Sequence, residues 1–187
     1  MKKALLITAA VLVLIAVGVY AGTQFFAKTD DKTPVVAVES TYKNEEVDVS
    51  FAYPDTYELQ ERNLTINGDM VRIITLLPKG VVIPEGGEGS TAITLAVFDG
   101  KEQISLTDWV HSMTNTFPVP TDGFDYQEIE VGGEKALAYT STGLYESDNV
   151  AIAKENKVYV FSASWLTRDD QILKDFTRLL ASVSFTK

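Results

Sequence analysis

Residues 4–21 form an unbroken apolar run near the start of the chain, ALLITAAVLVLIAVGVYA. As a helix this run rises about 27 Å, which is enough to cross the hydrocarbon core of a bilayer. Lys2 and Lys3 precede it. By the positive-inside rule, the N-terminus then stays in the cytoplasm and everything after residue 27 lies outside. The pattern predicts a single-pass membrane anchor within residues 1–27.

A cleaved signal peptide is the alternative for the same run, with Val19, Tyr20 and Ala21 as its cleavage site. The apolar region of a signal peptide usually has only about 7–15 residues, which favours the anchor. Under either interpretation the same domain is exported. Residues 28–45 follow with mixed charges, Thr and one Pro and no clear periodicity, which is typical of a linker.

Alternation of apolar and polar residues begins at Val47 and predicts a half-buried strand. Pro54 has no N–H group to donate, so it ends this strand. A turn at residues 53–56 would then lead into a returning strand that begins at Tyr57. The apolar positions of the first strand share one face: Val47, Val49, Phe51 and Tyr53.

Turn signals divide the rest of the chain into further strands. Asn67-Gly68 is the strongest signal for a hairpin, because both residues tolerate a positive φ. Two more hairpins are predicted, with turns at Gly132-Gly133 and at residues 154–157. Residues 158–161 read VYVF and are apolar on both faces, so we expect this strand at the centre of a sheet. Strands at 71–77 and 91–98 complete the set.

Two segments have helical periodicity. Residues 105–117 begin with Ser105 as a possible cap and Asp108 three positions later. Residues 167–183 begin in the same way with Thr167 and Asp170. Hairpin-length connections imply antiparallel pairing, and an antiparallel sheet with helices packed on it is an α+β domain. The apolar stripes of the two helices are Leu106, Trp109, Val110, Met113 and Phe117, and Ile172, Leu173, Phe176, Leu179, Leu180 and Val183.

Four stretches in this order resemble the PsbP-like family: FAYPDTYEL, SLTDWV, VGGEKALAYT and DFTRLLASVSF. The resemblance covers residues 46–187 and is closest to the bacterial envelope branch of the family. It implies a PsbP-like α/β/α sandwich in which an antiparallel sheet lies between helices. The known roles of the family are to bind or support partners, which implies that this chain is not an enzyme. Tyr57 departs from the pattern, because Trp is common at that position.

Composition narrows the chemistry that is open to the chain. The absence of Cys excludes disulfides, thiolate nucleophiles and thiolate metal sites. The formal net charge is −10, and removing the two positive charges of Lys2 and Lys3 leaves −12 for the exported part. A surface this acidic repels nucleic acid, so no nucleic-acid partner is expected. Solubility near a negative envelope explains the charge, and attraction of a basic partner is the alternative.

No motif predicts a catalytic, cofactor or metal site. His111 is the only histidine, and it lies about 200° around its helix from Trp109, on the solvent side. Residues 84–91, PEGGEGST, lack the Gly-Lys-Ser/Thr ending of a phosphate loop. The Asp pairs at 30–31 and 169–170, and Asp122 with Asp125, match no calcium-binding loop.

The crowded rings of Phe51, Tyr53 and Tyr57 could line a ligand site or belong to the core. Their strand periodicity favours a packed sheet edge. We therefore expect a membrane-tethered, extracytoplasmic and non-catalytic binding module, held in the membrane by residues 4–21, whose partner is an envelope protein. The alternative is an exported small-ligand carrier or a hydrolase of a type that the sequence does not identify, which would need a concave pocket with convergent polar groups.

Overall fold

The computed structural model describes residues 38–66, 68–81, 89–99, 105–113 and 125–186. The chain divides into two units, Met1–Val36 and Ala37–Lys187, and the fold described below belongs to the second. The predicted membrane span at residues 4–21 lies outside the described residues. Within the ranges given above, no helix is long and apolar enough to cross a membrane.

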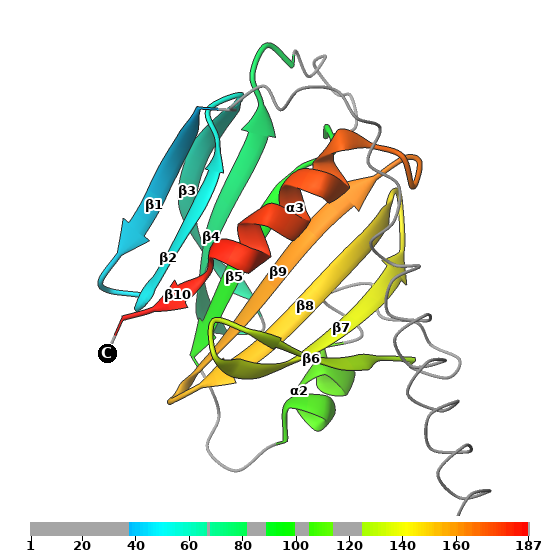
Figure 1. Ribbon diagram of the computed structural model, residues 1–187. Coiled ribbons are helices and arrows are strands. Elements are labelled where there is room, and N and C mark those ends of the chain that lie inside the picture. The colour runs from blue at the N-terminus through cyan, green and yellow to red at the C-terminus, as the bar shows by residue number, and fades with distance from the viewer. Residues whose placement is uncertain (1–37, 67, 82–88, 100–104, 114–124, 187) are drawn as a thin grey trace, which may run out of the picture. The chain divides into compact units, whose positions relative to one another are not determined.

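A seven-stranded antiparallel sheet forms the centre of the domain, in the order β3-β4-β5-β9-β8-β7-β6 (Figure 1). The central strand is β9, whose residues 158–161 are buried on both faces, as its apolar sequence predicted. The strand bounds are Tyr57–Ile66 for β3, Asp69–Pro78 for β4, Ile93–Asp99 for β5, Gln127–Val131 for β6, Glu134–Thr142 for β7, Glu146–Lys154 for β8 and Lys157–Trp165 for β9.

Three of the four predicted hairpins are confirmed. Ile66 pairs with Asp69, Val131 with Glu134, and Lys154 with Lys157. Each turn contains residues with a positive φ, including Gly68 at 89° and Glu155 at 53°. A two-residue turn of this kind matches the right-handed twist of the strands that it joins.

A second, three-stranded sheet has the order β1-β2-β10 and was not predicted. It consists of β1 (Glu39–Asn44), β2 (Val49–Pro54) and β10 (Ser184–Phe185). The predicted linker at 28–45 is therefore too long, because residues 39–44 belong to the folded domain. The segment has only one large apolar residue, Tyr42, which stacks on Phe51 with ring centroids 4.9 Å apart. A single ring gives no periodic signal in the sequence.

The strand that begins at Tyr57 does not return along β2, so the predicted hairpin at residues 53–56 is wrong. The N–H group of Asp55 donates to the carbonyl of Val38, at the start of the small sheet, whereas the carbonyl of Thr56 accepts from Lys79, next to β4. The chain thus crosses from one sheet to the other between residues 55 and 56. Proline 54 ends β2 as predicted, but the turn changes sheets instead of closing a hairpin.

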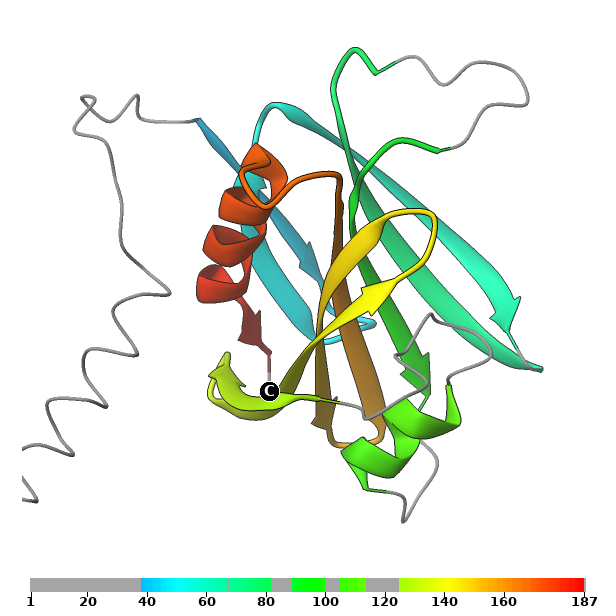
Figure 2. The same cartoon turned by 90° about the vertical axis from the view of Figure 1, so that its right-hand side faces the viewer.

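Two helices cover opposite faces of the large sheet. Helix α3 (Gln171–Ser182) lies beside the small sheet on one face, and α2 (Leu106–Ser112) packs near β8 on the other (Figures 1 and 2). The cap of α2 is confirmed, since the Ser105 hydroxyl accepts from the Asp108 N–H group at 3.1 Å. The predicted cap of α3 is wrong: Thr167 lies in a turn before the helix, whose first residue is Gln171. The α+β class and the helices on both faces agree with the prediction.

Two apolar clusters hold these layers together. The larger lies between the large sheet, α3 and the small sheet, and includes Phe51, Phe161 and Phe176. The smaller lies under α2 and includes Phe98 and Trp109, whose ring centroids are 5.0 Å apart. Phe51 and Tyr57 are buried and Tyr53 packs against the larger cluster, so these rings belong to the core, as predicted.

Candidate functional site

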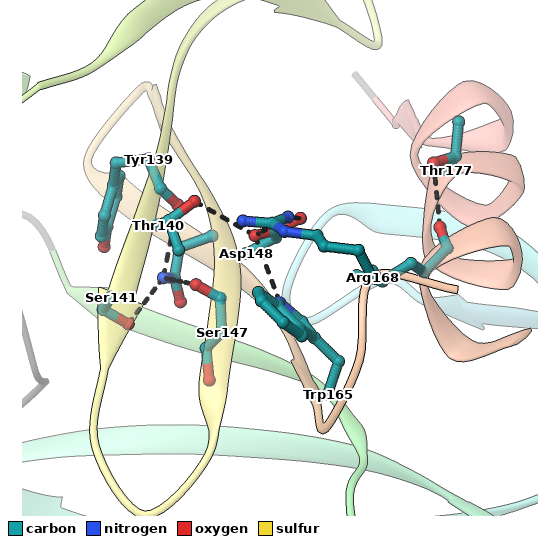
Figure 3. Close-up of polar contacts among 10 residues, drawn as sticks. Tyr139, Thr140, Ser141, Ser147, Asp148, Trp165, Arg168 and Thr177 are labelled. Atoms are coloured by element: carbon teal, nitrogen blue, oxygen red, sulfur yellow. Dashed lines mark hydrogen bonds and ion pairs between the residues drawn. The ribbon is translucent and has the colours of Figure 1, made fainter. Parts of the chain in front are cut away.

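Two clusters of hydrogen-bonded polar side chains lie on β8, near its connection to β7 (Figure 3). Neighbouring residues of a strand point to opposite faces, so Asp148 and Asn149 belong to two separate clusters. Asp148 lies on the face of α3 and Asn149 on the face of α2. These two clusters are the candidate functional site, because they bring together carboxylate, guanidinium, amide, hydroxyl and indole groups from β7, β8, β9 and the turn before α3.

The Asp148 cluster joins three strands and the turn before α3 through one carboxylate. Arg168 Nη1 contacts both carboxylate oxygens of Asp148, at 2.9 and 2.7 Å. The Thr140 hydroxyl and the Trp165 indole N–H donate to Oδ1, at 3.1 and 3.3 Å. Arg168 also stacks on the Trp165 ring, 4.0 Å from its centroid. The carboxylate thus accepts four contacts from three donor groups and fixes the segment between β9 and α3.

The Asn149 cluster connects β7, β8 and β9 on the other face. Its amide donates to the Ser141 hydroxyl at 2.9 Å and to the Ser147 carbonyl at 3.1 Å, and its oxygen accepts from the Ser162 hydroxyl at 2.8 Å. Asn149 and Ser141 are both buried. Buried polar groups need such partners, since leaving one unpaired costs about 1–3 kcal/mol. An amide cannot take a proton from a serine, so neither hydroxyl is activated as a nucleophile.

A third polar contact lies beneath α3. The Tyr57 hydroxyl donates to Asp175 Oδ2 at 2.9 Å, and Gln171 Nε2 donates to Oδ1 at 3.0 Å. Asp175 is only 4% exposed, and Arg178 lies 3.7 Å from its Oδ1. Burial, together with the charge of Asp175, raises the pKa of Tyr57 above its ordinary value of 10.0, so the hydroxyl stays protonated and donates.

Sequence analysis missed all three clusters. Only Asp175 could have been noticed in the sequence, because it is an acidic residue beside Phe176 in the buried stripe of α3. Asp148 and Arg168 are far apart in the sequence and meet only because β8 pairs with β9. No local pattern connects them. The same holds for Asn149, whose partners come from three strands.

The structure describes only some of the residues that the sequence suggests for chemistry. His111 is exposed on α2, on the side predicted from its helical spacing. Asp170 accepts from the Thr167 hydroxyl and from the backbone N–H groups of Leu166 and Thr167, and these bonds lower its pKa. Asp125 is exposed. The phosphate-loop candidate at 84–88, Asp30, Asp31 and Asp122 lie outside the described residues.

The acidic residues do not combine into a metal centre in the part of the chain that the structure covers. No group of three His, Cys, Asp or Glu side chains there lies close enough to hold an ion. The chemistry of the described clusters is hydrogen bonding between side chains that already satisfy one another. The arrangement can position loops and a helix, and it presents Arg168, with 57% of its side chain exposed, at the surface.

No protein-family model matches the sequence, and no curated protein matches it either. Among solved structures, cyanobacterial PsbP (CyanoP) from Synechocystis sp. PCC 6803 matches with a TM-score of 0.55 at 12% identity, over 86% of this chain and 98% of that one. The chain has a PsbP-like fold.

A second similar structure is a protein from Bacteroides thetaiotaomicron VPI-5482. It matches with a TM-score of 0.52 at 10% identity. The match covers 79% of this chain and 48% of the Bacteroides protein, so the PsbP-like domain corresponds to about half of that longer chain. At these identities the likeness concerns the fold alone, and it confirms the fold that the four sequence stretches indicated.

Proposed function

We propose that this chain is a membrane-tethered module that faces outside the cytoplasm and acts by binding a protein of the envelope, without catalysis. The observation that carries the proposal is the extent of the PsbP-like fold: the match to CyanoP covers 86% of the chain. The N-terminal region contributes the second part of the proposal, because its sequence contains the apolar run at 4–21 behind Lys2 and Lys3. The proposed layout is one anchor followed by one domain.

The polar clusters support binding over catalysis. Asp148, Asn149 and Asp175 each have their oxygens and donors engaged by neighbouring side chains. A general base needs a lone pair that points at the substrate, and a nucleophile needs a base beside it. The larger apolar cluster also fills the interface between the large sheet and α3 with buried side chains. No observation favours the carrier or hydrolase alternative.

Membrane extraction of the full chain tests the tether. We expect the protein to stay in the membrane fraction in high salt and at alkaline pH and to leave it only in detergent. Protease added outside spheroplasts should digest the domain. The intact mass distinguishes the anchor from a signal peptide, since cleavage after Ala21 would remove the first 21 residues. Release by salt alone would contradict the tether.

A variant with two charges in the apolar run is the control. Leu12→Lys with Ile15→Lys places two ammonium groups at the centre of the predicted span, each costing about 2.5–3.5 kcal/mol there. We expect this variant to appear in the soluble fraction or to be retained in the cytoplasm. If it fractionates with membranes as the natural chain does, the run at 4–21 is not what holds the protein there.

A further inference from the structure

Strand β3 forms a long open edge of the large sheet. It is the outermost strand in the order, has ten residues and pairs only with β4 (Figure 1). Glu58 and residues 60–65 are exposed. Across the described ranges of the chain, no other strand pairs with the outer side of β3. An edge of this kind presents a row of unpaired N–H and C=O groups to solvent.

The direction of these backbone groups follows from the pairing with β4. The carbonyl of Thr56 accepts from the Lys79 N–H group at 2.8 Å, so this even-numbered residue directs its backbone groups toward the β4 side. Backbone groups alternate in direction along an antiparallel strand. Leu59, Glu61 and Asn63 therefore point their N–H and C=O groups outward, where another strand would bind.

Strand β3 lacks most of the usual means of blocking an edge. Natural edges are protected by Pro, charged side chains, bulges or short length, and of these β3 has only charged side chains, which carry both signs: Glu58, Glu61 and Arg62. The sequence of β3, YELQERNLTI, has neither Pro nor Lys, and its register with β4 runs from Tyr57 to Ile66 without a bulge. The opposite edge is shorter, because β6 has only five residues. The long edge is the one left open.

The charges of β3 complement those of a second copy of the same strand. We infer that β3 pairs with β3 of another copy, antiparallel, about a two-fold axis that passes beside Gln60. In that register Glu58 of each copy lies opposite Arg62 of the other, and the two Gln60 residues face each other. Opposite charges across a strand pair are favourable and like charges unfavourable.

Neighbouring registers are less favourable. A two-fold axis at Glu61 places two carboxylates opposite each other, and one at Arg62 does the same for two guanidinium groups. An axis at Leu59 shortens the paired stretch, because the strand begins at Tyr57. With the axis at Gln60, Leu59 and Glu61 of opposite copies exchange outward hydrogen bonds, and so do Tyr57 and Asn63. The two large sheets then become one continuous sheet.

Disulfide cross-linking of the full chain in its membrane tests this register directly, because the natural sequence has no Cys. The inferred pair of Gln60 residues is not hydrogen-bonded, so their Cα atoms would lie about 4.5 Å apart. That spacing is within the range for a disulfide. Gln60→Cys should form a covalent dimer in high yield under mild oxidant. Thr65→Cys, exposed on the same strand but far from its counterpart in this register, is the matched control and should not.

A charge exchange supplies the second measurement. Arg62→Glu in the Gln60→Cys background places two pairs of like charges in the interface, and we expect dimerisation to weaken roughly tenfold. Adding Glu58→Arg restores both opposite-charge pairs and should restore the yield of dimer. Circular dichroism confirms that each variant is folded. Equal yields for Gln60→Cys and Thr65→Cys, or no recovery in the exchanged variant, would overturn the inference.

Discussion

The two faces of the large sheet are built differently. The face toward α3 is covered by a helix and a second sheet, and its cluster contains rings from β2, β9 and α3. The face toward α2 has a smaller apolar cluster, which includes Trp109 and Val110 of that short helix. Farther along, a row of polar residues crosses four neighbouring strands in register: Thr75, Thr94, Ser162 and Asn149. Apolar packing stabilises the first face, whereas apolar packing and side-chain hydrogen bonds together stabilise the second.

Truncating one buried ring on each face should give the largest loss of unfolding free energy, and the loss should differ between the two faces. Phe161→Ala removes a fully buried ring that packs edge-on against Phe51, 6.2 Å between centroids. We expect it to lower the free energy of unfolding by about 4–5 kcal/mol. Phe98→Ala, on the adjacent strand and the opposite face, should cost about 3 kcal/mol. Urea unfolding followed by Trp fluorescence measures both, and a larger loss for Phe98→Ala would reverse the comparison.

Substitutions at Gly132 and Gly133 test how tightly β10 packs against the turn between β6 and β7. A Cβ atom at Gly132 would lie 2.9 Å from the Phe185 ring, whereas one at Gly133 would meet nothing within 4 Å. Both residues have a positive φ, so both changes to Ala cost about 1–2 kcal/mol of backbone strain. Gly132→Ala should cost about 1–2 kcal/mol more, because Phe185 must also move. Equal losses in thermal unfolding would mean that Phe185 does not pack there.

Removing one hydroxyl tests the polar contact beneath α3. Tyr57→Phe leaves one oxygen of the buried Asp175 without its donor, and we expect a loss of about 1–3 kcal/mol in unfolding free energy. Tyr145→Phe is the control, since its hydroxyl bonds the Gly89 carbonyl on an exposed loop and should cost at most about 0.5 kcal/mol. If Tyr57→Phe leaves the free energy of unfolding unchanged, Asp175 has found another donor.

A milder effect is expected at alkaline pH. Burial raises the pKa of Tyr139 from 10.0 to about 12. The unfolded chain loses this proton first, so the folded state becomes less stable as pH rises from about 10 to 12. In that window Tyr139→Phe should remove a slope of about 1.4 kcal/mol per pH unit from the unfolding free energy. Unfolding at several pH values measures it, and parallel curves for the two proteins would contradict the burial of this hydroxyl.

Local chemistry explains what the sequence predicted well. The turn at Gly132-Gly133 is specified by two glycines that adopt a positive φ, so this hairpin could be placed without the structure. The turn at residues 154–157 could be placed because a short polar stretch separates two apolar runs. The apolar stripe of α3 and the two-sided burial of β9 follow from periodicity in the same way. In each case the decisive residues are neighbours in the sequence.

Long-range pairing explains what was missed. β10 joins β2 through Ser184 and Ser50, whose hydroxyls lie 2.8 Å apart although they are 134 positions apart in the chain. Nothing near Ser184 indicates that partner. The small sheet, the change of sheet after Asp55 and the contact of Arg168 with Asp148 all depend on such distant encounters. Periodicity identifies a strand and its buried face, but not the strand beside it.

A double-mutant cycle on Asp148 and Arg168 tests the central claim most directly, which is that the polar clusters hold the fold together and are not sites for chemistry. The free energy of unfolding is measured for Asp148→Ala, Arg168→Ala and the double variant. A two-contact pair stacked on Trp165 predicts a favourable coupling of about 1 kcal/mol. A coupling near zero, with Arg168→Ala as stable as the natural chain, would contradict the claim and leave Arg168 available to a ligand.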